Sequence, residues 1–247
     1  MKLSLRGAGE LCAGHVVALH LRACARSAPC RVQAVDAIAG HGLEGDCHAS
    51  VLSPRQVLIA SRLSYQALGL PPMALRENVL VDFPVDGIVS GSRLRFSSGV
   101  EMVAMFRCEP CGRLDRHQRG LQSRIGAERG LLARVTDGGV LRPGDGVRVT
   151  EGSASPLWSD DWRERVRQVL KSVPHDRWVT YGRLAELAGV SAGYCRAFPR
   201  LLACSPSGVH ERAGPANWTG HRGEPWDGAH LHDMLLSNRL LEKRSET

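Results

Sequence analysis

Short runs of apolar residues, separated by glycine-rich turns, fill the first 150 residues of the chain. Such runs, four to eight residues long and partly alternating with polar positions, are typical of buried and half-buried strands. The expected strands cover residues 14–21, 31–38, 56–60, 78–83, 92–96 and 100–106, with a turn and closing strand at 144–149. A short helix is expected from Ser61 to Leu68, because Gly69 and the Pro71-Pro72 pair would end it. Many short strands with glycine turns predict a β-barrel-like domain over residues 1–150.

The pattern changes after residue 150. Small and polar residues with one proline form a predicted linker at residues 151–157. The next apolar positions have helical spacing and follow Ser159 as the expected N-cap: Trp162, Val166, Val169, Leu170 and Val173. A turn at 178–182 precedes two short helices, 183–188 and 191–204, which Gly189 joins in a helix-turn-helix pattern. We therefore expect an α+β protein with a small, mainly helical second domain at residues 158–247.

Composition narrows the class of protein. Hydrophobic residues make up 43% of the 247 positions, enough for a substantial core. No stretch of 18 apolar residues exists, so no membrane span and no membrane partner are expected. The first residues lack the long apolar segment of a signal peptide, so the eight cysteines are expected to be reduced in a cytoplasmic protein.

The net charge of +7 is spread along the chain. Residues 1–157 contain 19 basic residues (Lys and Arg) and 14 acidic residues (Asp and Glu). Residues 158–247 contain 13 basic and 11 acidic residues. The excess is therefore not a basic tail, although it is locally high within residues 162–200, at 8 against 3. A modest positive face can bind phosphates, but a solvated, arginine-rich surface accounts for the charge equally well.

Cys108 and Cys111 form a C-x-x-C pair after the apolar run that ends at Phe106, beside an arginine-rich segment. Nearby positive charge favours the thiolate, which is both a nucleophile and a soft metal ligand. Two buried cysteines would be the simplest interpretation. Zinc would need more ligands than this pair offers, and a redox dithiol would open a helix within a βαβ unit. We favour one thiolate that ligates a cofactor metal, with the other nearby, although the spacing alone does not decide.

Four pieces of the first domain follow one another in a defined order. They are Gly42-Leu43-Glu44-Gly45-Asp46-Cys47-His48, Arg76-Glu77-Asn78, Cys108-Glu109-Pro110-Cys111, and Arg129 to Val135 running into Gly138 to Asp145. Together they resemble the MOSC domain, the type found at the C-terminus of molybdenum-cofactor sulfurases. In that family a cysteine at the position of Cys111 is the expected molybdenum ligand and catalytic residue, with Cys108 as the second candidate.

The resemblance implies a bound molybdenum cofactor (Mo-molybdopterin), which is an anionic pterin with a phosphate and a dithiolene. Arginine suits the phosphate because its fork donates two parallel hydrogen bonds, and an asparagine can donate and accept at a pterin edge. The candidate cofactor contacts are Asp46, His48, Arg55, Arg76, Asn78, Arg129 and Arg134. Each arginine could equally be a surface charge, and for Asp46 we favour the pinning of the glycine loop through backbone amides.

The resemblance also implies a reaction. Members of the family remove the oxygen atom from N-hydroxylated small substrates, with electrons from a separate reductase, and other members carry sulfur. The chain has no ferredoxin-type run of cysteines, so the electrons are expected from a partner protein.

Residues 158–247 resemble the DNA-binding domain of O6-alkylguanine-DNA alkyltransferases and alkyltransferase-like proteins. The segment 173–185 and Arg196-Ala197 carry the resemblance, and Ser205-Pro206 stands where the family has Asn-Pro. It implies a winged-helix-like domain whose DNA contacts would be Tyr181, Gly182, Arg183, Ser191 and Arg196. The spacing from the tyrosine to the arginine is one residue longer than usual. The acceptor motif Pro-Cys-His-Arg is absent, so no alkyl transfer is expected.

Two hypotheses of different class follow. The first is a molybdenum-dependent oxidoreductase that acts on N-hydroxylated compounds, such as base analogues, and is coupled to a DNA-binding domain. The second is a non-enzymatic module that recognises DNA damage, with an accessory or sulfur-carrying MOSC domain. Metal analysis of protein from a host that makes the cofactor separates them.

Overall fold

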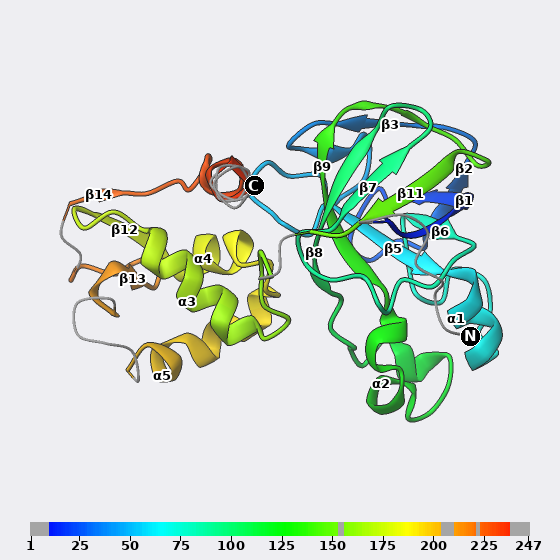
Figure 1. Ribbon diagram of the computed structural model, residues 1–247. Helices are drawn as coiled ribbons and strands as arrows, with labels where there is room; N and C mark the ends of the chain where they lie inside the picture. Colours follow the sequence, from blue (N-terminus) through cyan, green and yellow to red (C-terminus); the bar gives the residue numbers. More distant parts are fainter. Residues whose placement is uncertain (1–9, 153–155, 204–209, 221–222, 238–247) are drawn as a thin grey trace. The chain divides into compact units, whose positions relative to one another are not determined.

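The computed structural model describes residues 10–152, 156–203, 210–220 and 223–237 (Figure 1). The chain divides into two compact units. The first, here called the barrel unit, comprises Met1–Val51 and Arg55–Trp158. The second, here called the helical unit, comprises Leu52–Pro54 and Ser159–Thr247.

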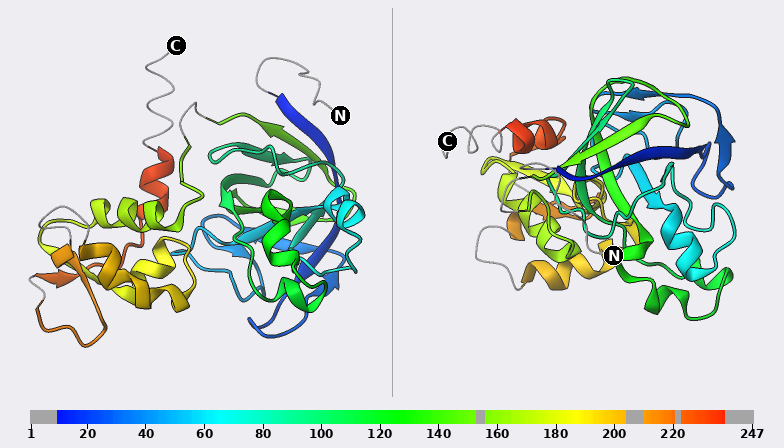
Figure 2. Two further views of the ribbon diagram at one scale, coloured as in Figure 1. Left: turned by 90° about the horizontal axis from the view of Figure 1, so that it is seen from below. Right: turned by 45° about the vertical axis from the view of Figure 1, so that its right-hand side comes forward.

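An eight-stranded sheet forms the barrel unit, in the order β11-β7-β8-β9-β5-β6-β1-β2. Strand β1 also pairs with β11, and this second pairing closes the sheet into a ring (Figures 1 and 2). Within this sheet, the described pairings are antiparallel except that between β5 and β6. The strands are β1 (Glu10–Leu21), β2 (Cys30–Val32), β5 (Val57–Ser61), β6 (Val79–Val81), β7 (Arg93–Phe96), β8 (Glu101–Arg107), β9 (Leu131–Asp137) and β11 (Gly146–Thr150). The predicted β-barrel is confirmed.

A smaller sheet and two short helices complete the barrel unit. The sheet has the order β10-β3-β4 and consists of β3 (Val35–Ile38), β4 (Gly42–Leu43) and β10 (Gly139–Leu141). Helix α1 (Arg62–Leu68) follows β5, and the 3-10 turns η1 (Leu114–Arg116) and η2 (Gly126–Arg129) flank α2 (Leu121–Arg124).

Side chains that alternate along the strands fill the barrel. Val57 and Ile59 on β5 and Val79 and Val81 on β6 have no exposed surface, and Leu19 on β1 joins them in one apolar core. Burial of this area is the main force that holds the ring together. A smaller apolar cluster lies between β5 and the segment around α2, and contains Ala60, Leu75, Leu114, Leu121 and Ile125.

Local sequence explains most of these boundaries. Ser61 caps α1 by accepting a hydrogen bond from the Leu63 amide at 3.1 Å, and Gly69 ends the helix with a φ of 61°. The strand expected at residues 31–38 is instead two strands, β2 and β3. The break lies at Gln33 and Ala34, where the chain leaves the edge of β1 for the smaller sheet. Strand β9 was not among the expected strands, because its sequence does not alternate and includes a buried arginine, Arg134.

The helical unit departs more from the sequence prediction. Asp161, not Ser159, is the N-cap of α3 (Trp162–Ser172), and its carboxylate accepts from the Arg163 amide at 2.9 Å. The expected turn at 178–182 contains a strand, β12 (Arg177–Thr180), and α4 (Tyr181–Leu187) begins directly after it. The last predicted helix is a 3-10 segment, η3 (Ala192–Ala197), followed by α5 (Phe198–Ala203).

A small sheet accompanies these helices. Strands β13 (Ala213–Gly214) and β14 (Glu224–Pro225) both pair parallel with β12, and the 3-10 turn η4 (His210–Arg212) precedes β13. An antiparallel hairpin would be expected of a wing, so a winged-helix domain is not confirmed. Ser205-Pro206, which belong to the family resemblance, and the last residue of the helix predicted at 191–204 lie outside the described residues.

A buried arginine and an aromatic cluster stabilise the helical unit. Arg165 has no exposed surface, and its guanidinium donates to the carbonyls of Ala188, Ser159 and Asp160 at 2.9, 3.0 and 2.9 Å. The Trp162 ring lies 5.0 Å from that of Tyr194 and 6.3 Å from that of Phe198, between ring centroids. Within the described part of the chain, no helix has the length and apolar character needed to cross a membrane.

Candidate functional site

Asp46 is the centre of a buried polar cluster in the barrel unit. Its Oδ2 accepts from the Arg22 amide at 3.0 Å and from Asn78 Nδ2 at 2.7 Å, and its Oδ1 accepts from the His48 amide at 2.9 Å. The Arg22 guanidinium lies 3.6 Å away. Burial alone would raise the pKa of the Asp46 carboxyl, but the bond to His48 and the charge of Arg22 hold this pKa below its usual value. The carboxylate therefore fixes the 46–48 loop against the end of β1.

The polar atoms of the Asn78 side chain are all hydrogen-bonded to other residues of the barrel unit. Its Oδ1 accepts from the Leu58 amide at 3.0 Å and from Arg22 Nη2 at 3.4 Å, and its Nδ2 donates to the His20 carbonyl at 3.2 Å as well as to Asp46. Only 1% of the residue is exposed. An amide has two donors and one acceptor oxygen. All of them are engaged here, so Asn78 positions the loops rather than presenting itself to a ligand.

Arg76 occupies the left-handed region, with a φ of 55°. Its Nη2 donates to the carbonyls of Ala25 and Ser27, at 3.2 and 2.7 Å, and Arg113 Nη1 donates to the same Ala25 carbonyl at 3.1 Å. Burial lowers the pKa of the Arg76 guanidinium, and the positive charges of Arg22 and Arg113 lower it further. Cationic groups therefore gather around the 22–27 loop.

A second buried hydrogen-bond network holds the residues that flank Arg76. Tyr65 donates its hydroxyl to Glu77 Oε2 at 2.5 Å and accepts from the Leu75 amide at 3.0 Å. The other carboxylate oxygen of Glu77 lies 3.4 Å from His20 Nδ1. Burial and the Glu77 charge raise the pKa of the Tyr65 hydroxyl, so it stays protonated and remains a donor. These contacts fix the residues on both sides of Arg76.

Two exposed thiols accompany the arginines. Backbone amide and hydroxyl donors at Arg26 and Ser27 lower the pKa of the Cys24 thiol. Burial raises the pKa of the Cys47 thiol, and so do the nearby charges of Asp46 and Cys24. Cys24 therefore has more thiolate character than Cys47.

The C-x-x-C pair lies in the loop after β8. Cys108 is buried, and its amide donates to the Gly130 carbonyl at 2.9 Å, whereas Cys111 is exposed. Arg55 approaches Cys108 rather than the Asp46 cluster: its Nη2 lies 3.9 Å from Cys108 Sγ and its Nη1 3.0 Å from Glu109 Oε2. Cys111 is thus the accessible thiol of the pair, two residues before Arg113.

Arg129 and Arg134 are buried, with exposed fractions of 7% and 1%. Arg129 donates to the Leu75 carbonyl at 2.7 Å, and Arg134 donates to the Val51 carbonyl at 3.0 Å. Both guanidinium groups therefore stabilise neighbouring loops through hydrogen bonds to backbone carbonyls.

The predicted DNA contacts of the helical unit lie on α4 and on the η3 segment that follows it. Tyr181 begins α4, its ring packs edge-on against Phe198 at 5.7 Å, and burial raises the pKa of its hydroxyl. Arg183 pairs with Glu186 at 3.1 Å. Ser191 and Arg196 are exposed, and Gly182 lies in the first turn of α4.

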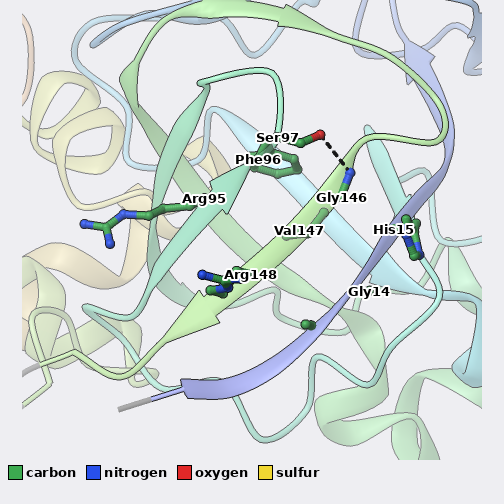
Figure 3. A pocket seen from close by; sticks show the side chains of 9 residues that line it. Gly14, His15, Arg95, Phe96, Ser97, Gly146, Val147 and Arg148 are labelled. Atoms are coloured by element: carbon green, nitrogen blue, oxygen red, sulfur yellow. Dashed lines mark hydrogen bonds between the residues drawn. The ribbon is translucent and has the colours of Figure 1, made fainter. Parts of the chain in front are cut away.

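A groove of about 530 Å³ lies elsewhere on the barrel unit, against β1, β7 and β11. Figure 3 shows Arg95 and Arg148 on neighbouring strands beside it, with His15 on β1. Arg95 is neutralised by Glu101, whose Oε1 lies 2.7 Å from its Nε. None of the residues predicted from the sequence lines this groove, so it is distinct from the cysteine-bearing loops.

The structure brings four of the predicted cofactor contacts together, namely Asp46, His48, Arg76 and Asn78. Sequence reasoning missed Arg22, Cys24, Cys47 and Arg113, which belong to the same set of loops. A signal for Cys47 was present, because it lies inside the Gly42 to His48 motif. The partners of Arg22 depend on the pairing of β1 with β6, which no local pattern predicts.

Comparison with known proteins agrees with this barrel. Residues 44–148 match the MOSC domain family. The chain is similar in fold to the YuaD protein of Bacillus subtilis, with 19% identity over 57% of this chain and 98% of that one, at a TM-score of 0.51. YiiM from Escherichia coli matches at 16% identity over 78% of this chain and 92% of its own, with a TM-score of 0.45. No curated protein matches the sequence.

The match to the family ends at residue 148, and neither this match nor the likeness to YuaD supports an alkyltransferase-like second domain. The four ordered motifs lie within or next to the matched range, which agrees with the resemblance drawn from them. The chain therefore contains a MOSC domain at residues 44–148.

Proposed function

We propose that the barrel unit binds a molybdenum cofactor and reduces N-hydroxylated compounds, with Cys111 as the protein ligand of the metal. The observation that carries the proposal is the gathering of Arg22, Arg76 and Arg113 beside loops that bear exposed thiols. A MOSC domain is associated with this cofactor, and the matched range contains Cys111.

The residues fit the anionic part of such a cofactor. Besides burial, the guanidinium groups of Arg22, Arg113 and Arg129 lower the pKa of Arg76. Asp46 is the carboxylate that pairs with Arg22. An anionic phosphate placed there would relieve the repulsion among these cations and accept charge-assisted hydrogen bonds. Arg129, Arg134 and Asn78 are committed to the fold, so we assign the phosphate to Arg76 and Arg113.

The exposed thiol of Cys111 fits the metal. A soft thiolate is the ligand type that a molybdenum centre would take from the protein. Cys108 is buried next to Arg55, which leaves Cys111 as the accessible member of the pair. The bound cofactor would supply the two-electron chemistry, and the loops of this chain would orient it.

Reduction of an N-hydroxylated substrate consumes two electrons and two protons and releases water. The electrons come from a separate reductase in this proposal. The segment Gly40-His41-Gly42-Leu43-Glu44-Gly45 has the spacing of a dinucleotide-binding turn, but it contains strand β4 and no helix begins there. It therefore lacks the helix N-terminus that such a turn uses to bind phosphates.

Activity measurements test this proposal. Protein made in a cofactor-competent host is assayed for reduction of an N-hydroxylated base analogue with a chemical electron donor. Cys111→Ala is expected to reduce turnover to background with an unchanged melting temperature, and Cys108→Ala to reduce it less. Full turnover in Cys111→Ala would remove the ligand assignment.

As a second function, we propose that the helical unit binds DNA. Arg196, Arg200 and Tyr194 are exposed on the η3–α5 segment, and 38% of Tyr194 is exposed. Cations beside an exposed aromatic ring suit a nucleic-acid backbone and its bases. A binding module without enzymatic activity would show this property alone.

A further inference from the structure

Three consecutive side chains of the barrel unit present different metal-binding atoms to one point. They are Asp46 Oδ1, Cys47 Sγ and His48 Nδ1, which all lie within 4.8 Å of one another. Consecutive residues usually point apart. Here the loop is bent because Asp46 is fixed by Arg22 and Asn78 while its Oδ1 accepts the His48 amide.

From this geometry we infer that Asp46, Cys47 and His48 form a binding site for a thiophilic divalent metal ion of the zinc type. A carboxylate oxygen, a thiolate and an imidazole are all zinc ligands, and the thiolate selects against magnesium and calcium. The inference goes beyond the proposed cofactor, whose metal is assigned to Cys111, and does not rest on it.

Two of the three ligand separations can be compared with those around a tetrahedral ion. With zinc–nitrogen and zinc–oxygen bonds of about 2.0–2.1 Å and a zinc–sulfur bond of about 2.3 Å, tetrahedral ligands lie roughly 3.4 Å apart for nitrogen and oxygen and roughly 3.6 Å apart for nitrogen and sulfur. His48 Nδ1 lies 3.3 Å from Asp46 Oδ1 and 3.0 Å from Cys47 Sγ. The first pair already has the required separation. The second needs to open by about half an ångström, which a rotation of the exposed Cys47 side chain can provide.

We assign the fourth ligand to Cys24, which lies two residues after Arg22 in the loop that follows β1. The Arg22 amide lies 3.0 Å from Asp46 Oδ2, so this loop is adjacent to the 46–48 loop. The main chain holds their loops together, because the Cys47 amide donates to the Arg22 carbonyl at 2.8 Å. Asp46 can coordinate the metal through Oδ1 while its Oδ2 still accepts hydrogen bonds from the Arg22 amide and from Asn78 Nδ2. These two hydrogen bonds fix the orientation of the carboxylate.

The charges of the site are compatible with a cation. Asp46 and two thiolates would carry three negative charges, which the positive charges of Arg22 and Arg76 and the two charges of the metal would balance. Binding displaces the proton of the Cys47 thiol, so the affinity should fall as the pH is lowered.

Cobalt titration of the full chain tests the site. Metal-free, reduced protein is titrated with Co²⁺, whose thiolate charge-transfer and tetrahedral ligand-field bands report the ligand set, and Zn²⁺ is then added to displace it. We expect one Co²⁺ per chain. Removal of a residue that only hydrogen-bonds to a metal ligand lowers metal affinity by roughly 10–100-fold. Cys47→Ala and His48→Ala each remove a ligand itself, so each should lower the Co²⁺ affinity by at least that factor.

Matched variants make the result decisive. Cys24→Ala should weaken binding and remove part of the charge-transfer band, whereas Cys30→Ala, another exposed cysteine, should change neither. Cys111→Ala should leave Co²⁺ binding unchanged, although it would abolish the proposed oxidoreductase activity. Absence of tetrahedral Co²⁺ at micromolar protein, unchanged binding in Cys47→Ala, or loss of the signal in Cys111→Ala would each overturn the inference.

Discussion

The Asn78 side chain makes four hydrogen bonds from a nearly inaccessible position, so its truncation is a sensitive test of the buried cluster. Asn78→Ala leaves the Leu58 amide and the His20 carbonyl without this partner. A buried polar group deprived of its partner costs about 1–3 kcal/mol. With two such groups, we expect the free energy of unfolding of the barrel unit to fall by about 2–6 kcal/mol, and Asp46 also loses its 2.7 Å bond.

Urea unfolding followed by far-ultraviolet circular dichroism, with amide exchange of the β5 peptide, measures this loss. Two units need not unfold in one transition, and exchange at Leu58 reports on the barrel alone. Asn217→Ala is the matched control, because Asn217 is exposed and lies in the helical unit. Its effect should stay within about 0.5 kcal/mol. A loss below about 1 kcal/mol for Asn78→Ala would refute the assignment of Asn78 as a structural residue.

Three further predictions follow from the electrostatics. The pKa of the Asp46 carboxyl is lower in the folded state than in the unfolded state, so its contribution to stability is present at neutral pH and is lost as the pH falls below about 4. In Asp46→Asn, the free energy of unfolding should therefore fall less steeply below about pH 4. Cys24 should react with iodoacetamide faster than Cys47 at pH 8, as peptide mass spectrometry can measure, and equal rates would contradict the pKa order. Arg196→Ala should weaken DNA binding by the full chain and reduce its salt dependence in gel shifts, and no retardation of DNA by the parent protein at low salt would leave the helical unit with another role.

The barrel could be predicted from sequence because its strands are short, apolar and separated by glycines. Strand β9 was not predicted because Arg134 interrupts its apolar run, although Arg134 is buried in the structure and donates to the Val51 carbonyl. The helical unit was predicted less accurately. Strand β12 looks like a turn in sequence, and it is a strand only because distant segments, β13 and β14, pair with it.

The candidate site shows the same limit. The motifs placed Asp46, His48, Arg76 and Asn78 in one region, but their spacing could not separate a ligand contact from a structural bond. Asn78 illustrates this, because its side chain was predicted to contact a pterin edge but makes its hydrogen bonds to other residues of the barrel unit. Arg22 was missed because its role comes from long-range strand pairing rather than from its neighbours in sequence.

Molybdenum and pterin content is the most direct test of the central claim that the MOSC domain holds the cofactor. Protein is purified from a host that makes the cofactor, metal is measured by mass spectrometry, and pterin is measured by fluorescence after oxidation, with a known molybdoenzyme from the same host as the positive control. The account predicts close to one molybdenum and one pterin per chain, with molybdenum lost in Cys111→Ala and pterin reduced in a double Arg76→Ala and Arg113→Ala variant. Protein without molybdenum or pterin, when the control enzyme is loaded, would contradict it.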